Sequence, residues 1–309
     1  MSDLRKSRVR TSLRRSAWPS ALALLLVLAA VHAAGQRGIA QRSDNLRPGL
    51  SGLVADSADS ATASVADTVT IFSHPRVQNN AFRAGERLVF DVSYGFITAG
   101  EAVIQIPRIE QVRNRDAFRV EFLVNSLPSF SWIYKVEDRY LTFIDTISLL
   151  PHRFEQHIRE GSYKRDFVAD FDRDRRVAVT TEGEFPILPE VHDIFSAFFY
   201  ARTVDYSGMG VGDSILLYNY YRDRYYELMI RILGRQELEV EAGTFRTIVV
   251  EPIVKEGGLF KSEGRIVIWL TDDDLKIPVR VNTKVVIGSI DSELREYAGL
   301  AGPLKSRIR

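Results

Sequence analysis

The sequence predicts an all-β protein, in which a single curved antiparallel sheet of about a dozen strands forms a barrel-like or roll architecture with one helix packed against it. Three observations lead to this fold class. From residue 82 onward, apolar side chains recur at every second position, which is the period of a half-buried strand. Turn-forming residues separate these segments, and one segment alone has the spacing of an amphipathic helix.

The first 34 residues have the pattern of a secretory signal peptide. Six basic residues precede an apolar run at residues 21–31, and the small residues Ala33, Ala34 and Gly35 follow it. The run is shorter than the ~20 residues that a membrane-spanning helix needs. We therefore expect cleavage and release into the periplasm, with a retained N-terminal anchor as the alternative.

Residues 35–81 are expected to form a disordered tether. From residue 35 to about residue 70 there is no aromatic residue, and Ser, Ala, Asp and Thr follow one another without a period. Such a segment cannot bury enough surface to offset its chain entropy. The folded domain is then predicted over residues 82–296, followed by a flexible C-terminal tail at residues 297–309.

The strands of this domain are expected where the period is two. In order, they are residues 88–94, 102–106, 118–124, 136–144, 153–159, 163–170, 177–181, 215–221, 225–232, 237–240, 245–253, 265–270 and 277–287. Turn residues such as those at 160–162, 172–174 and 241–243 lie between them. One domain of this kind is predicted.

Residues 193–204 are the exception to the strand pattern. Ile194, Ala197, Phe198 and Ala201 recur at helical spacing, and Asp193 precedes them as an N-cap. Among so many strands, one apolar helix is expected to plug or flank the open side of the curved sheet.

Three consecutive aspartates, Asp272, Asp273 and Asp274, lie between the last two apolar runs. A calcium-binding loop needs acids at alternating positions, a central glycine and a distant glutamate. The segment lacks that pattern, because Leu275 and Lys276 follow directly. We interpret it as a solvated hairpin turn.

Other composition and motif evidence excludes several kinds of chemistry. The chain has no cysteine, so disulfides, thiolate metal sites and a cysteine nucleophile are absent. Without residues 1–34 it has 41 − 6 = 35 basic and 40 − 1 = 39 acidic residues. This charge balance does not favour binding to the phosphate backbone of a nucleic acid. No cofactor motif or metal site is predicted, since His152 and His157 would face opposite sides of a strand. Acid pairs such as Glu182 with Glu184 are interpreted as solvated surface.

Aromatic residues supply the candidate ligand-binding positions. Residues 216–228 place five tyrosines around an Arg-Asp-Arg turn, which could grip a ligand or pack across a hairpin. The expected helix adds phenylalanines. The candidates are Phe195, Phe198, Phe199, Tyr218, Tyr220, Tyr225 and Trp269; no catalytic residue is predicted.

Several short motifs occur in a characteristic order. They are FRAGERLVFDVSYGFITAGEAVI at residues 82–104, YKVEDRY at 134–140, DIFSAFFYAR at 193–202, EAGTFRTIVVEP at 241–252, and IWLTDDDLKIPVRV followed by IGSIDSEL up to residue 294. In this order they resemble the bacterial exported family catalogued as domain of unknown function 3108. The resemblance implies an envelope protein with a curved, barrel-like β fold, and it implies no agreed activity or catalytic residues.

We expect a non-enzymatic envelope protein that binds or carries a hydrophobic or lipid-like ligand. One alternative is an assembly or scaffold protein that binds an envelope protein or a glycan, which a cavity too small for a ligand would favour. The other is a carboxylate-dependent hydrolase, which two converging carboxylates with one raised pKa would favour. Membrane contact is expected only through the export segment.

Overall fold

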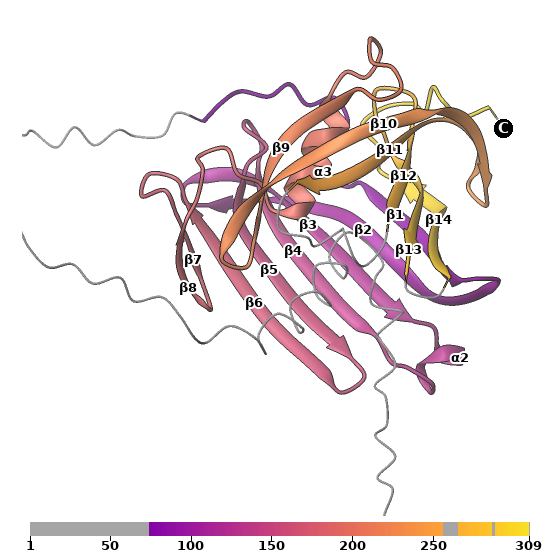
Figure 1. Cartoon of the computed structure of the whole chain (residues 1–309), viewed down its shortest axis with the longest axis horizontal. Helices are drawn as coiled ribbons and strands as arrows, with labels where there is room; N and C mark the ends of the chain where they lie inside the picture. The colour runs from indigo at the N-terminus through magenta and orange to yellow at the C-terminus, as the bar shows by residue number, and fades with distance from the viewer. Residues whose placement is uncertain (1–73, 256–264, 286–287, 309) are drawn as a thin grey trace, which may run out of the picture.

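The computed structural model describes residues 74–255, 265–285 and 288–308. They form one antiparallel sheet of 14 strands with two helices, so the predicted fold class is confirmed. The sheet curls into a barrel-like shape that is not closed (Figure 1). The expected signal peptide and most of the tether fall outside the described residues. Within those residues, no helix has both the length and the apolar composition that crossing a bilayer requires.

The elements follow one another along the chain with short connections. The strands are β1 (Arg87–Tyr94), β2 (Ile97–Val112), β3 (Arg115–Ser126), β4 (Glu137–Asp145), β5 (Pro151–Glu160), β6 (Tyr163–Asp172), β7 (Val177–Thr180), β8 (Gly183–Pro186), β9 (Ser214–Tyr221), β10 (Arg224–Val240), β11 (Gly243–Lys255), β12 (Ile266–Thr271), β13 (Pro278–Lys284) and β14 (Ser289–Ala298). The helices are α2 (Pro128–Ser131) and α3 (Ile194–Thr203).

The strand order is that of two meanders joined in the middle. It runs β8 to β1 and then β14 to β9, so that β1 pairs with β14 from Arg87 opposite Ala298 to Tyr94 opposite Ile290. The edges are β8 and β9. The edge of β9 is partly covered by the backbone of His192. The His192 N–H donates to the Tyr218 oxygen, and the Tyr220 N–H donates to the His192 oxygen.

The strands differ from the sequence prediction where the alternation is interrupted. The two strands expected at residues 225–232 and 237–240 are one long strand, β10, with a register shift between Ile232 and Gly234. A bulge changes the period without ending the pairing. The sequence prediction lacked β14, whose buried face contains Ile290, Ser292 and Leu294, because a serine at the middle inward position breaks the apolar pattern.

Both ends of the described domain are more ordered than expected. In the expected tether, the Val77 N–H donates to the Ile147 oxygen and Ala81 is buried. In the expected flexible tail, Arg307 bridges to Phe245 of β11, and the Ser306 N–H donates to an Asp273 carboxylate oxygen at 3.0 Å. The tail is therefore packed against the sheet, through hydrogen bonds to the backbone and to the aspartate loop that a periodicity argument does not detect.

The helix α3 lies between two hydrophobic clusters, at the end of the molecule where the halves of the sheet face each other (Figure 1). Phe195 and Phe199 belong to the larger cluster, which β1 to β6 dominate. Ala197 and Ala201 belong to the second cluster, which β10 to β13 dominate. The helix thus fills the space inside the curved sheet, as its apolar stripe predicts.

A buried ion pair fixes the C-terminal end of α3. Arg202 and Glu86 have 0% and 1% of their side chains exposed, and two hydrogen bonds of 2.6 and 3.0 Å join them. The guanidinium also donates to the Leu275 and Ala81 oxygens. Its carbon lies 5.2 Å from the centre of the Phe199 ring, which adds a cation–π contact.

The aspartate loop is a turn, with one acid in a structural role. Asp273 accepts hydrogen bonds from the Thr271 hydroxyl and the Leu275 N–H as well as from Ser306. Asp274 instead lies exposed and pairs with Lys305 at 2.6 Å. The expectation that all three acids are merely solvated is therefore wrong for Asp273.

We expect Arg202→Met to lower the free energy of unfolding by about 3–5 kcal/mol, because it leaves the Glu86 carboxylate buried without its partner. The double variant Arg202→Met/Glu86→Leu should recover a large part of this loss. Urea unfolding of the four chains in this cycle measures the coupling. Strictly additive losses would contradict a mutual dependence of the two side chains.

We expect Asp273→Ala to lower the free energy of unfolding by about 1–3 kcal/mol, since the Thr271 hydroxyl and three backbone N–H groups lose a common acceptor. Asp274→Ala is the matched control and should leave the melting temperature unchanged. Equal melting temperatures for the two variants would show that Asp273 does not organise this turn.

Candidate functional site

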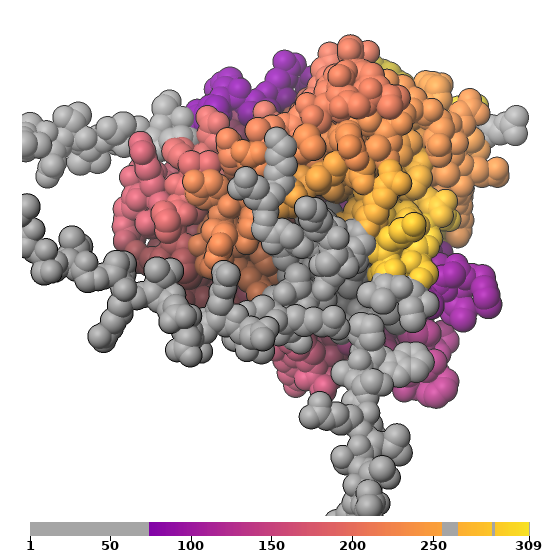
Figure 2. Space-filling model, viewed as in Figure 1, coloured from indigo at the N-terminus to yellow at the C-terminus, as the bar shows by residue number. Residues whose placement is uncertain are grey.

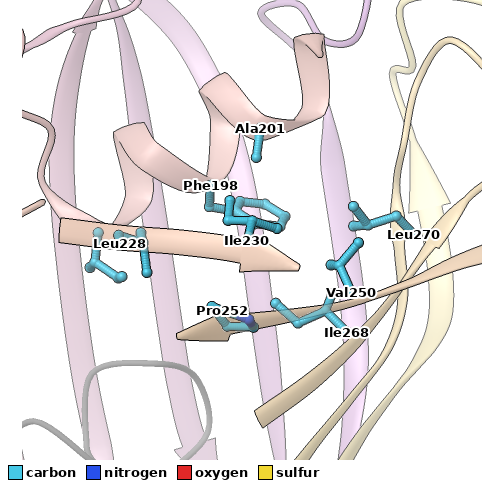
Figure 3. Close-up of a pocket in the computed structure, with 9 residues that line it drawn as sticks. Phe198, Ala201, Leu228, Ile230, Val250, Pro252, Ile268 and Leu270 are labelled. Carbon is cyan, nitrogen blue, oxygen red and sulfur yellow. The ribbon is translucent and has the colours of Figure 1, made fainter. Parts of the chain in front are cut away.

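A recess with an apolar lining lies between α3 and the second half of the sheet (Figure 3). One wall is α3, and the other is formed by β10, β11 and β12. The lining residues are Ile194, Phe198, Ala201, Leu228, Ile230, Val250, Pro252, Ile268 and Leu270. The recess has a volume of about 40 Å³. The recess can hold an apolar group of a ligand. Its lining side chains have no polar atom that could activate water or bind a polar group.

The wall formed by α3 is positioned by capping bonds at both ends. Asp193 accepts hydrogen bonds from the Phe195 and Ser196 N–H groups and from the Thr142 hydroxyl of β4. Burial raises the pKa of Asp193 against the effect of these bonds. At the other end, the Tyr206 hydroxyl donates to the Ala201 oxygen at 3.1 Å.

The three phenylalanines predicted for ligand binding lie on α3 but in different surroundings. Phe195 and Phe199 are buried in the main core, where Phe195 lies 5.3 Å from the Phe122 ring and Phe199 lies 4.7 Å from the Phe82 ring. Phe198 is half-buried and lines the recess. Of the seven predicted residues, Phe198 is the one among the recess-lining side chains.

The four other predicted residues lie on the sheet, away from the recess lining. The Tyr218 and Tyr225 rings meet edge to face at 6.2 Å across β9 and β10. Tyr220 is buried, and its hydroxyl donates to the Arg222 oxygen. Trp269 lies under the Arg280 guanidinium, 5.4 Å from the indole centre. The structure therefore does not bring the seven residues together into one site.

Two buried carboxyl groups that the sequence analysis did not single out lie at the ends of β4 and β5. Asp138 is 3% exposed and Glu160 6%, and their carboxyl groups are hydrogen bonded to each other. Asp138 also accepts the Arg159 N–H at 2.7 Å. Burial, and then the charge of Asp138, raises the pKa of Glu160 to about 8. Burial also raises the pKa of Asp138, so the pair favours one proton held between the two carboxyl groups at neutral pH.

The surroundings of the acid pair connect it to α3. Tyr140 lies two residues beyond Asp138 on the same face of β4, and its ring is 5.7 Å from that of Phe195. Burial, and then the nearby acids, raises the pKa of Tyr140 well above its usual value. The side-chain nitrogen of Gln156 is buried here and has no hydrogen-bond partner among the described residues.

The sequence contained one signal for this pair. Asp138 occupies a position of β4 that faces inward with Tyr140, so a strict period of two places an acid in the core. Glu160 gave no such signal, because it borders a glycine turn. Since 22 positions separate the two residues, only the pairing of β4 with β5 brings them together.

The histidines His152 and His157 both pair with carboxylates. Burial alone would raise the pKa of Asp145, but hydrogen bonds from His152, Arg115 and two backbone N–H groups hold it well below its usual range. His157 pairs instead with Asp166. No cluster of three or more potential metal ligands occurs within the described ranges.

Glu182 and Glu184, which were predicted to be solvated surface residues, form partly exposed ion pairs. Glu182 pairs with Arg165, and Glu184 pairs with Arg175. The recess and the acid pair therefore remain as the candidate sites among the described residues.

Residues 89–295 match the model of a family described as "Protein of unknown function (DUF3108)". No curated protein sequence matches the chain. A solved β-barrel-like protein of domain of unknown function DUF1849 from Brucella abortus aligns with a TM-score of 0.46 and 10% identity, over 70% of this chain and 98% of that one.

A second solved structure, provisionally described as an exported protein with a YmcC-like fold from Bacteroides fragilis, aligns with a TM-score of 0.34 and 11% identity, over 74% of this chain and all of that one. A third, provisionally described as a lipoprotein from Parabacteroides distasonis, has a TM-score of 0.34 and 10% identity, over 72% of this chain and all of that one. These likenesses concern the fold and carry no argument about function.

We expect Glu160→Gln to remove a pH dependence of stability. The pKa of Glu160 is about 8 in the folded chain, above the usual 4.5, so its contribution is fully present below pH 4.5 and is lost as the pH rises towards 8. Between pH 5 and 8 the unmodified chain should lose about 2–4 kcal/mol relative to the Gln variant. Urea unfolding at several pH values measures this difference, and parallel curves would refute the shared proton.

Proposed function

We propose that this chain, which belongs to the DUF3108 family of proteins of unknown function, is an exported envelope protein that binds the apolar end of a hydrophobic, lipid-like ligand. The proposed site is the recess between α3 and β10–β12. The observation that carries the proposal is its lining, which consists of nine apolar side chains on a helix and three strands. Such a surface gains free energy by removing apolar ligand surface from water.

The size of the recess limits how a ligand would bind. A volume of about 40 Å³ is far below the ~300–1,000 Å³ of pockets that enclose small molecules. The recess would therefore take one end of an acyl chain, and a longer part would enter only if α3 moved. Phe198 is the residue to vary, because its half-buried ring lines the recess.

We expect Phe198→Ala to enlarge the recess and to increase the affinity for dansyl-undecanoic acid several-fold, while Phe198→Trp should fill the recess and abolish binding. The alanine variant should lose about 1–2 kcal/mol of stability, since the ring is only partly packed. Fluorescence titration measures binding. Leu216→Ala is the control, because Leu216 is 50% exposed on β9 and does not line the recess.

Equal affinities for the Ala and Trp variants would contradict ligand binding in the recess. No binding by any of these chains would favour the alternative in which the protein binds an envelope protein or a glycan on its surface, which the small volume of the recess also favours.

The acid pair supports a second candidate function, carboxylate-dependent hydrolysis. One proton held between Glu160 and Asp138 would place a general acid next to a general base. Both groups are buried, so a substrate would reach them only after the end of the sheet opened. The test measures hydrolysis of envelope glycans or esters by the chain and its variants. Activity that both Glu160→Gln and Asp138→Asn abolish, while Glu182→Gln retains it, would support this function.

A further inference from the structure

Four apolar side chains are exposed on two neighbouring turns, and we call them the apolar rim (Phe96, Ile97, Trp132 and Ile133). Phe96 is 98% exposed and Trp132 81%, while Ile97 and Ile133 are 48% and 59% exposed. The turn between β1 and β2 and the helix α2 project from the same end of the sheet, away from α3 (Figure 1). Large apolar side chains exposed together indicate a contact surface.

The local structure holds the two turns side by side. Gly95 adopts a left-handed conformation, with φ of +62°, in the two-residue turn that presents Phe96. The Leu127 N–H, just before α2, donates to the Ala99 oxygen of β2 at 2.9 Å. The Ser131 hydroxyl donates back to the Leu127 oxygen at 2.8 Å. The apolar rim is therefore a fixed surface formed by two connected turns.

The apolar rim carries no charge. Residues 94–98 and 127–134 contain no acidic or basic residue, although 26% of the chain is charged. The first charged side chain after α2 is that of Lys135, which pairs with Glu137 at 2.9 Å and remains 61% exposed. The Trp132 indole N–H already donates to the Ser129 oxygen at 2.9 Å. The apolar rim can therefore leave water without burying a charge or an unsatisfied indole donor.

We propose that the apolar rim docks the domain on the surface of a lipid bilayer. A stable interface with a protein needs ~800 Å² from each partner, which four side chains on two projecting turns do not provide. Aromatic and aliphatic side chains on such turns suit the boundary between lipid headgroups and acyl chains, where tryptophan rings gather. Membrane contact would then extend beyond the export segment to which the sequence prediction confined it.

The test follows Trp132 itself, so that the apolar run at residues 21–31 does not contribute to the signal. The full chain with Trp18→Phe and Trp269→Phe has Trp132 as its single tryptophan. It is mixed with vesicles of phosphatidylethanolamine and phosphatidylglycerol, with and without brominated acyl chains. We expect the Trp132 emission to shift to shorter wavelength and to be quenched by the brominated lipid.

Two matched variants of the single-tryptophan chain test the apolar rim. Phe96→Ser/Ile133→Ser should weaken vesicle binding of Trp132 by about tenfold or more, and Phe96→Leu/Ile133→Leu should retain it. Val211→Ser is the control, because Val211 is 77% exposed and lies in the loop between α3 and β9. All variants should keep the same melting temperature, since the substituted side chains are exposed.

Three results would overturn the proposal. Trp132 could remain unquenched by brominated lipid, or Phe96→Ser/Ile133→Ser could bind vesicles as well as Phe96→Leu/Ile133→Leu does. The emission could also shift with protein concentration in the absence of vesicles, which would show that a second copy of the chain covers the apolar rim.

Discussion

The buried ion pair between Arg202 and Glu86 is the interaction on which the arrangement of the other elements depends. The Arg202 guanidinium, at the end of α3, donates to Ala81 and Glu86 in the segment before β1 and to Leu275 in the loop between β12 and β13. Two charges in an apolar interior are tolerated only when they meet each other and their hydrogen bonds are complete. The pair therefore fixes the depth of α3 between the two halves of the sheet, and the recess is the space that remains beside the helix.

The helix α3 also separates the recess from the main hydrophobic core. On one side Phe198 lines the recess against β10 to β12 (Figure 3). On the other side Phe195 contacts Tyr140, which follows Asp138 on β4. In the space-filling view, the orange residues of β9 to β11 form the top of the described surface, and the pink residues of β6 to β8 lie at its left edge (Figure 2).

The period of two predicts most of the strands, because each strand buries one face, and the helical spacing together with Asp193 predicts α3. The same argument fails where a polar residue occupies an inward position, as Ser292 does in β14. It also fails where hydrogen bonds to distant residues order a segment, as those of Ser306 to Arg246 and Asp273 do. The candidate site was predicted only through Phe198. The acid pair depends on strand register, which a single sequence does not specify for residues so far apart.

The pairing of β1 with β14 has a consequence for how the chain acquires its structure. The first strand of the sheet lies beside the last, with Arg87 opposite Ala298, so their contact spans almost the whole domain. A chain that emerges N-terminus first, from a ribosome or through a translocation pore, can build the first meander early but keeps β1 as a bare edge until the final strand is released. Such slow, long-range closure leaves a period of exposure to aggregation, during which a holding chaperone would protect the half-built sheet.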